Sequence, residues 1–413
     1  MGNNNTEIEK PVFIDLFCGA GGMSLGFEEA GFQGVCAVDF HPDPLKTYEL
    51  NRVNIKKKLL ILNEDIRELK GDAILKKIWR KFKIKENNDV IIGGPPCQGF
   101  SLRGKRNKQD PRNNLLFEFF RLIEEIKPEI FVFENVPGLL MKNYNDTLDS
   151  IFKTITSLGY RYGFELLNSA DYGVPQNRER FIIIGSKSCE KVYFPKIPQT
   201  RKSNILNFFD RENQKYDVVP YVKRKVTAFE ALNDIANKNN EENPTLYSKT
   251  PLGPYQENFQ WKKNRLYNHI TTKHSKTTQE RFSQFKQGYS MKDIPEDYRT
   301  KRSSVQKMYA RKPARTITSC NEDFIHYAHN RIITIREMAR LQSYPDNYVF
   351  YGTPTTGGER RRVSCCQVQQ LGNSVPPLLA QAIAECVRKM MGLSSNNKLK
   401  NFIELLNKRN LKN

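Results

Sequence analysis

One cysteine in an unusual setting is the first residue of this sequence that could do chemistry. Cys97 lies in the stretch GGPPCQGFS (93–101), which directly follows the apolar run 90–92. The two prolines fix the backbone and remove two hydrogen-bond donors, so they stiffen the loop at the thiol. A thiolate held near a cation or a helix N-terminus can act as a nucleophile. The competing interpretation is a small buried hydrophobic residue, the usual role of a free cysteine.

Charged residues lie at the ends of two further apolar runs. Glu134 ends the run 130–133, and Arg178 and Arg180 precede the run 181–184. A carboxylate beside a nucleophile can protonate a ring nitrogen. Alternate residues of an extended chain face the same way, so the pattern predicts that both guanidiniums point into one site. A surface or helix-capping acid and two surface arginines in ordinary salt bridges are the alternatives.

A glycine-rich turn follows the first apolar run. Residues 19–22 (GAGG) come after the run 12–14 and before a helical stretch. Glycines in this position let a ligand approach the backbone closely. Asp39 ends the next run, 35–38, where an acid suits ribose hydroxyls. These features predict a nucleoside-containing cofactor, and a dinucleotide oxidoreductase would use them equally well.

The spacing of the apolar runs predicts the fold. Short β-branched runs bounded by glycine, proline or polar residues are typical of buried strands. Helix-like stretches such as 115–126 separate them, and this repetition indicates a parallel α/β sheet. Ligands of such sheets bind beyond the carboxyl ends of the strands. Further along, 334–337 fits a capping box that opens a helix, and 378–391 has a helical pattern.

Composition narrows the classes of protein. The 413 residues suggest two or three domains. The net charge is +21, and roughly half of this excess lies in residues 191–310, where aromatic and basic residues alternate. Such a segment favours a nucleic acid as partner. A loop-rich insertion without a ligand is the alternative.

Cysteine usage and the termini set the expected environment. The 8 cysteines form no Cys-x-x-Cys pair, so neither a metal site nor a disulfide framework is expected. The first residues lack the apolar segment of a signal peptide, and no apolar run is long enough to span a membrane. We therefore expect a protein of a reducing cytoplasm.

Six segments, in this order, resemble the DNA (cytosine-5)-methyltransferase family of bacterial restriction-modification systems. They are Asp15–Gly22 (DLFCGAGG), Gly94–Ser101 (GPPCQGFS), Glu134–Val136 (ENV), Gln176–Arg180 (QNRER), Arg311–Ser319 (RKPARTITS) and Gly372–Val375 (GNSV). They cover nearly the whole chain, and the order PCQ, ENV, QxRxR is highly specific. The long stretch between the fourth and fifth segments corresponds to the target-recognition region of the family.

The resemblance implies a fold and domain boundaries. We expect a Rossmann-like S-adenosylmethionine-dependent methyltransferase sheet with a second, smaller, basic target-recognition domain. The expected parts are a catalytic domain at 11–190 completed by 365–393, a target-recognition domain at 191–330, a connection at 331–364 and a polar basic tail at 394–413.

The resemblance also implies a mechanism. The Cys97 thiolate attacks C6 of cytosine, Glu134 holds or protonates N3, and Arg180 with Arg178 binds O2. C5 then takes a methyl group from S-adenosyl-L-methionine, which leaves S-adenosyl-L-homocysteine. The base must be flipped out of the duplex to be reached. A mobile loop at 101–114 is expected to close over it, with DNA contacts from the polar and basic residues Gln98, Ser101, Arg103, Lys105 and Arg106.

The same comparison implies the residues of the cofactor pocket. The methionine end should meet the first glycine-rich segment, the ribose an acid, and the adenine an aromatic ring and the segment 65–66, with four further residues completing the pocket. The residues are Phe17, Gly19, Gly22, Asp39, Phe40, Asp65, Ile66, Pro95, Leu115, Asn373 and Ser374.

Double-stranded DNA is the expected partner, acted on by a monomer that pairs functionally with a restriction endonuclease. One alternative keeps the chemistry but uses tRNA, and another is a non-catalytic DNA-binding homologue. The intact Cys97, Glu134 and Arg180 argue against the second alternative. A zinc deaminase is excluded because the position that would hold its second cysteine is Phe100.

Overall fold

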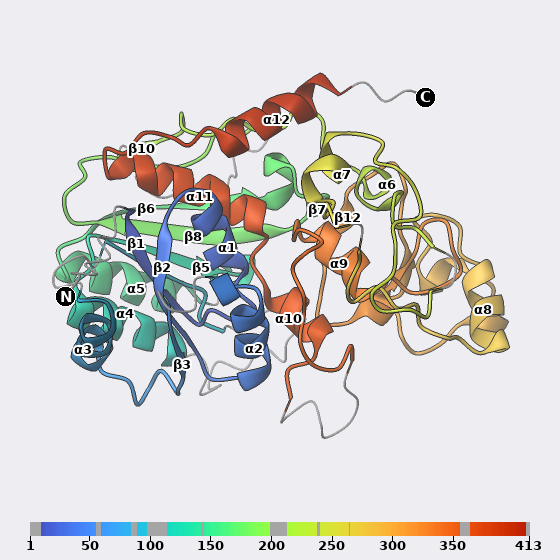
Figure 1. The fold of residues 1–413 in the computed structure, drawn as a ribbon, viewed down its shortest axis with the longest axis horizontal. Helices are drawn as coiled ribbons and strands as arrows, with labels where there is room; N and C mark the ends of the chain where they lie inside the picture. Colours follow the sequence, from blue (N-terminus) through green and yellow to red (C-terminus); the bar gives the residue numbers. More distant parts are fainter. Residues whose placement is uncertain are drawn as a thin grey trace, which may run out of the picture. The chain divides into compact units, whose positions relative to one another are not determined.

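The computed structural model describes residues 10–54, 59–83, 89–96, 114–141, 144–198, 213–237, 240–263, 265–355 and 364–409 (Figure 1). The chain forms two compact units, each assembled from several segments. Unit 1 comprises Met1–Asn168, Glu179–Tyr221 and Leu379–Lys400, and unit 2 comprises Ser169–Arg178, Val222–Leu378 and Asn401–Asn413. Among the helices in the described ranges, none is long and apolar enough to cross a membrane.

A seven-stranded sheet forms the centre of unit 1. In spatial order its strands are β3 (Leu60–Asn63), β2 (Gln33–Asp39), β1 (Val12–Leu16), β4 (Val90–Gly93), β5 (Ile130–Asn135), β8 (Glu179–Ser186) and β6 (Arg161–Asn168). The first five strands are parallel, which confirms the predicted α/β sheet.

Strand β8 departs from the prediction, because it runs antiparallel to both β5 and β6. The apolar run 181–184 gives no information about strand direction. The chain between β6 and β8, residues 169–178, is shorter than the roughly dozen residues that a parallel crossover needs. The predicted parallel arrangement therefore does not extend to this strand.

Helices cover both faces of the sheet (Figure 1). They are α1 (Gly22–Glu29), α2 (Pro42–Leu50), α3 (Gly71–Phe82), α4 (Asn114–Ile126), α5 (Asn145–Ser157) and α11 (Pro377–Met390), of which α11 begins in unit 2 and continues in unit 1. The helices predicted at 115–126 and 378–391 are confirmed. Phe13 of β1 packs on Phe27 of α1, with ring centroids 5.7 Å apart, whereas its neighbour Ile14 joins the cluster under α4. Successive strand residues face opposite ways, so α1 and α4 cover opposite faces.

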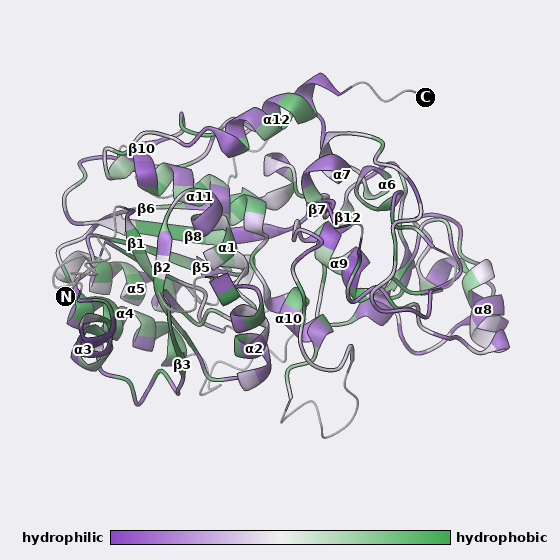
Figure 2. Ribbon diagram, viewed as in Figure 1, coloured by the Kyte–Doolittle hydropathy of each residue, from purple (hydrophilic) through white to green (hydrophobic). Residues whose placement is uncertain are grey.

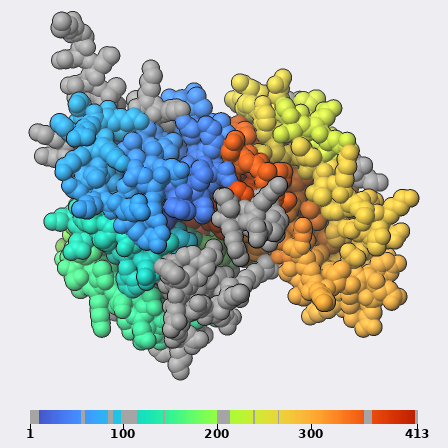
Figure 3. Space-filling model, turned by 90° about the horizontal axis from the view of Figure 1, so that it is seen from below, coloured from blue at the N-terminus to red at the C-terminus, as the bar shows by residue number. Residues whose placement is uncertain are grey.

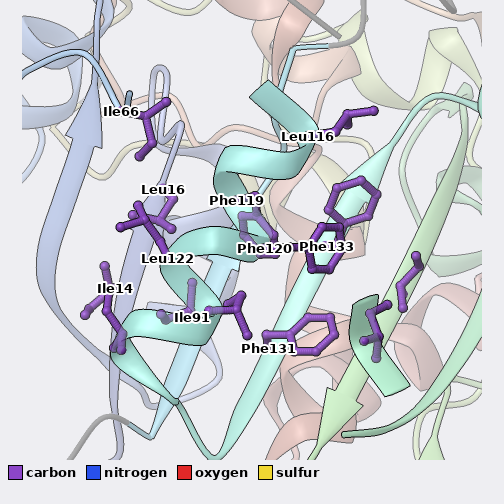
Figure 4. Packing of buried hydrophobic residues seen from close by; sticks show 14 of the residues in the cluster. Ile14, Leu16, Ile66, Ile91, Leu116, Phe119, Phe120, Leu122, Phe131 and Phe133 are labelled. Carbon is purple, nitrogen blue, oxygen red and sulfur yellow. The ribbon is translucent and has the colours of Figure 1, made fainter. Parts of the chain in front are cut away.

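The core under α4 is rich in aromatic rings (Figure 4). Phe119 and Phe120 of α4 pack against Phe131 and Phe133 of β5, with ring centroids between 5.4 and 6.3 Å apart. Figure 2 shows the strands of this sheet as mostly hydrophobic. All residues of β4 and β5 are buried. The core therefore holds the carboxyl ends of these two strands in place.

Unit 2 is built from short elements. Its helices are α6 (Ala228–Leu232), α7 (Pro254–Phe259), α8 (Lys276–Ser283), α9 (Ile335–Leu341) and α10 (Gln367–Asn373), and its strands pair as β7 (Gln176–Asn177) with β12 (Ala314–Arg315) and β11 (Gln306–Lys307) with β13 (Phe324–Ile325). Single 3-10 turns lie at Ser169–Tyr172, Met291–Asp293, Glu296–Tyr298 and Asn321–Asp323, and unit 1 has one at Pro137–Leu140. Figure 3 shows the yellow and orange residues of α8 and its neighbours as surface of this unit.

The units divide the chain differently from the predicted boundaries. The described residues of 191–221 belong to unit 1 and include β9 (Val192–Tyr193) and β10 (Gln214–Lys215). One contact that fastens them there is the Tyr216 hydroxyl, which donates to Glu165 of β6 at 2.9 Å. The predicted connection 331–364 lies wholly within unit 2, as does 365–378.

The last element in the described residues is helix α12 (Lys398–Lys408), in the segment where a polar basic, frayed or partly helical tail was expected. Leu399, Phe402, Ile403 and Leu406 are buried. Their spacing is that of one face of a helix. In unit 2 the ring of Phe402 packs near Phe259 of α7, with centroids 6.1 Å apart. The apolar stripe therefore outweighs the polar composition of this segment.

Helix α9 begins with the predicted capping box and carries arginines into the interior of unit 2. Thr334 and Glu337 make both reciprocal bonds of the box. The Arg340 side chain is fully buried between Asp234 and Asp346. It donates to Asp346 Oδ1 at 2.8 Å, to Asp234 Oδ2 at 3.0 Å and to the Ala231 carbonyl at 2.9 Å. One guanidinium therefore neutralises two buried carboxylates.

Replacing Arg340 with methionine should destabilise unit 2 by about 3–5 kcal/mol, because buried Asp234 loses its counter-ion and buried Asp346 keeps only Arg336, at 4.0 Å. Urea unfolding followed by circular dichroism measures the change. The matched control is Arg299→Met, whose exposed ion pair with Glu296 should contribute less than about 1 kcal/mol. An Arg340→Met protein as stable as the control variant would contradict this role.

Candidate active site

The end of β5 and the start of β8 bring a carboxylate and a guanidinium together. The two strands are antiparallel, with Asn135 opposite Phe181. Arg180 Nε lies 2.6 Å from Glu134 Oε1, and each side chain is only 10% exposed. Burial lowers the pKa of Arg180, and the charge of Glu134 opposes that shift. Two of the predicted site residues are thus in direct contact.

The two glycines before Pro95 lie where the neighbouring atoms leave no room for a side chain. A Cβ on Gly93 would lie 2.6 Å from the Leu16 carbonyl oxygen, and a Cβ on Gly94 would lie 2.6 Å from Glu134 Oε2. Neither position therefore accepts a side chain without a shift of its neighbours. Asn135 Nδ2 donates to the Pro95 carbonyl at 3.4 Å. The strand that leads to Cys97 consequently ends against the Glu134 carboxylate.

Several predicted residues lie outside the described ranges. They are the nucleophile Cys97 and the DNA-contacting residues Gln98, Ser101, Arg103, Lys105 and Arg106. Cys97 follows Gly94 by three positions in the chain. The roles of all six residues stay predictions.

Arg178 makes contacts of a different kind from Arg180. Its side chain is fully buried, and its terminal nitrogens donate to the main-chain carbonyls of Ile317 at 2.8 Å, Gly372 at 2.7 Å and Ser374 at 2.9 Å. The alternation argument placed both guanidiniums in one base-binding site. In the structure, Arg178 fastens residues 372–374 to the segment that contains Ile317, and its role at the base stays a prediction.

The neighbouring glutamine strengthens the same junction. Gln176 Oε1 accepts from the Ile317 amide at 2.8 Å, and its Nε2 donates to the Leu341 carbonyl at 2.9 Å. A Cβ on Gly372 would lie 2.4 Å from the Ser319 amide nitrogen, so the backbones touch there. Three of the segments that carry the family resemblance are thus joined within unit 2.

The turn after β1 has an unusual backbone. Phe17, Gly19 and Gly21 have φ angles of 62°, 52° and 80°. A bulky residue in this left-handed region costs about 1–3 kcal/mol, and such strain is concentrated at ligand clamps and switches. Around Gly19, the described atoms leave the place of a Cβ open to 4 Å. The turn therefore leaves room for a ligand beside its backbone.

Asp39 and Phe40 lie beside this turn at the end of β2. Asp39 Oδ2 accepts from the Gly19 amide at 2.8 Å, and Oδ1 accepts from the His41 amide at 2.8 Å. Burial raises the pKa of Asp39, and these backbone bonds oppose the shift. The Phe40 ring is 62% exposed. An open turn, an oriented carboxylate and an exposed ring suit an adenosyl cofactor.

The remaining pocket residues differ in their surroundings. Asp65 binds the Arg67 side chain, which lowers the pKa of the carboxyl. Ile66 packs into the core of unit 1, and Leu115 is partly buried against the same core. Gly22 and Pro95 are buried. Asn373 is exposed and Ser374 buried in unit 2, where the Tyr344 hydroxyl bonds Ser374 Oγ; the cofactor contacts of all these residues stay predictions.

The sequence did not point to a buried polar chain behind the glycine turn. It consists of Asp15, Ser24, Tyr48 and Arg52, together with Glu28. Asp15 is the first residue of the motif at 15–22, and Ser24 follows that motif. Tyr48 and Arg52 lie on and just after helix α2, and no local pattern marks them as neighbours of the turn.

Unit 1 defines the class of the protein. Its Rossmann-like sheet, with one antiparallel strand beside β5, is the fold of S-adenosylmethionine-dependent methyltransferases. The model of the C-5 cytosine-specific DNA methylase family matches residues 12–389, and the chain belongs to that family. The protein is a DNA (cytosine-5)-methyltransferase.

Relatives from bacteria resemble about nine tenths of the chain. Type II methyltransferase M.DdeI of Desulfomicrobium norvegicum is 35% identical over 396 residues, which are 90% of this chain and 87% of that protein. Type II methyltransferase M1.HphI of Haemophilus parahaemolyticus is 35% identical over 384 residues, which are 92% of this chain and 87% of that protein. Both relatives are named as enzymes of type II systems.

Solved structures share the fold. A crystal structure described as a DNA modification methyltransferase encoded within an E. coli prophage has a TM-score of 0.70 at 28% identity, over 92% of this chain and 99% of that one. The S. pombe Dnmt2 methyltransferase has a TM-score of 0.53 at 16% identity, over 93% and 100% of the two chains. At this low identity the second likeness concerns the fold alone.

Proposed function

We propose that the protein methylates one cytosine of a specific sequence in double-stranded DNA by a covalent mechanism at Cys97. The observation that carries the proposal is the buried Glu134–Arg180 pair against Gly94. One edge of cytosine presents N3, the exocyclic amine and O2. A carboxylate can bind N3 and the amine, and a guanidinium beside it can bind O2. The cysteine follows in the chain at the same strand end.

Glu134 takes up a proton from solvent as the base binds beside Arg180. The Cys97 thiolate then forms a bond to C6 while Glu134 passes this proton to N3, so that electron density moves to C5. The cofactor would supply its methyl group to C5 and leave as S-adenosyl-L-homocysteine when its sulfur–methyl bond breaks. A base then removes the C5 proton, the bond from Cys97 to C6 breaks, and N3 returns its proton. Arg180 holds O2 throughout, and its own charge remains balanced by Glu134 until the base arrives.

S-adenosyl-L-methionine supplies the methyl group as an electrophilic sulfonium in this scheme. The residues present fit it: Asp39 for the ribose, Phe40 for the adenine, and the open turn at Phe17 and Gly19 for the methionine end. The proposed product is S-adenosyl-L-homocysteine.

We also propose that the basic residues of unit 2 recognise the target sequence. Exposed lysines and arginines such as Lys262, Lys263 and Arg265 suit phosphate contacts. The type II names of both relatives favour a bacterial enzyme that works in the cytoplasm beside a restriction endonuclease.

Methylation of duplex DNA and of tRNA by the purified protein tests the substrate. We expect label from the methyl donor in DNA, at one cytosine of a recurring sequence found by sequencing modified bases. Methyl transfer to tRNA and not to DNA would show that tRNA is the substrate and would contradict the proposal.

Arg178 is proposed to position Asn373 and Ser374 for the cofactor. Arg178→Lys should raise the Kd for S-adenosyl-L-homocysteine about tenfold, because one ammonium cannot serve three carbonyls in the geometry of a guanidinium. Calorimetric titration measures this, with the exposed neighbour Asn177→Ser as the control. If Arg178 binds the base instead, kcat will fall while this Kd stays the same.

A further inference from the structure

Arg52, in the loop after α2, makes an ion pair, a hydrogen bond to a main-chain carbonyl and a contact with an aromatic ring. It is 4% exposed. Its Nε donates to Glu28 Oε1 at 2.7 Å and its NH2 to Glu28 Oε2 at 2.9 Å, a two-pronged ion pair with helix α1. The guanidinium carbon lies 3.8 Å from the centre of the Tyr48 ring. This arrangement fixes the plane of the guanidinium.

The fixed guanidinium reaches the glycine turn. Arg52 NH2 donates to the Gly21 carbonyl at 3.2 Å. Gly21 is the N-cap residue of α1, has a φ of 80°, and has no side chain to cap the helix. Its carbonyl also accepts the first helical bond, from the Leu25 amide at 2.9 Å. Arg52 therefore holds the peptide at which the turn becomes a helix.

A second chain of bonds fastens the same helical turn from the other side. Ser24 Oγ lies 2.8 Å from the Tyr48 hydroxyl and donates to Asp15 Oδ2 at 2.5 Å. Burial raises the pKa of Asp15 to about 7, and Ser24 and Arg52 oppose that shift. Strand β1, the start of α1 and the end of α2 are thus tied together behind the turn.

We propose that Arg52 is a positioning residue for cofactor binding. It holds the turn at Gly19–Gly22 in its left-handed conformation, so that the backbone is arranged before the methionine end of the cofactor arrives. The inference rests on the proposed use of this turn. An ion pair with Glu28 alone would stabilise α1 against α2, whereas the bond to the Gly21 carbonyl acts on the turn itself.

Arg52→Gln tests the proposal by separating affinity from turnover. The Kd for S-adenosyl-L-homocysteine should rise about tenfold to a hundredfold, since a hydrogen bond from a charged group is lost. The KM for the methyl donor should rise in parallel, while kcat at saturating donor and the Kd for DNA stay within about threefold. Arg52→Lys keeps Glu28 neutralised and should remain folded, with a Kd above that of the wild type.

The control is Lys46→Gln, which removes an exposed ion pair on helix α2, just before Arg52, and should leave the Kd unchanged. A lower melting temperature with an unchanged Kd in both Arg52 variants would overturn the proposal and leave a purely structural ion pair. A wild-type protein that does not bind S-adenosyl-L-homocysteine would overturn the proposed use of the turn instead, so the two failures are distinguishable.

Discussion

Replacing Cys97 with alanine is expected to reduce methyl transfer by at least about four orders of magnitude, because alanine has no thiol to form the bond to C6 that activates C5. Binding of duplex DNA and of S-adenosyl-L-homocysteine should stay within about threefold of the wild type. Incorporation of labelled methyl groups and a DNA-binding titration measure the two effects. The buried Cys36 offers a matched control, since Cys36→Ala removes a thiol from β2 without touching the site.

DNA with 5-fluorocytosine at the target position provides the second half of this test. Fluorine cannot leave C5 as a proton does, so the wild-type protein should become covalently attached to the DNA and the Cys97→Ala protein should not. Mass spectrometry of the digested complex identifies the attached residue. Methylation by purified Cys97→Ala protein, or attachment at another residue, would refute the mechanism.

Replacing Glu134 with glutamine should lower kcat about a hundredfold to ten-thousandfold, because the amide keeps the shape of the side chain but cannot protonate N3. The variant should also lose stability, since Arg180 keeps its buried charge without a counter-ion. Initial rates at saturating DNA and methyl donor separate the first effect from the second. The Kd for the methyl donor should change little.

Glu179→Gln is the matched control for this variant, because Glu179 is the exposed neighbour of Arg180 on the same strand. It should keep kcat within about threefold. A Glu134→Gln enzyme with a kcat within tenfold of the wild type would show that the Glu134–Arg180 pair is structural. That result would contradict the proposed contact between Glu134 and the base.

Strands and helix starts that are encoded by a few neighbouring residues were predictable from the sequence. The runs at 12–14, 90–92 and 130–133 became β1, β4 and β5, and the capping box at Thr334 opened α9. Strong apolar periodicity, turn glycines and caps act over a few residues, and so they are visible in one sequence. Glu134 and Arg180, predicted for one site, are in direct contact, and their roles toward the base stay predictions.

Features that depend on distant contacts were not predictable in this way. The direction of β8 follows from the short connection after β6, and an apolar run is the same in either direction. The residues around Arg178 in the sequence belong only to its own motif. Its guanidinium nevertheless binds the carbonyls of residues 317, 372 and 374, which lie far away in the sequence. Arg52 meets Gly21 because the chain after α2 lies beside the start of α1, a contact between residues 31 positions apart.

The place of β8 in the sheet has a consequence for how the protein is made. Strand β6 is synthesised before β8, but in the sheet β8 separates it from β5. A growing chain that ends before Glu179 therefore leaves β5, with six buried residues, as an unpaired apolar edge. The strand that closes this edge also delivers Arg180 to Glu134. The pairing that completes the sheet therefore also assembles the charge pair.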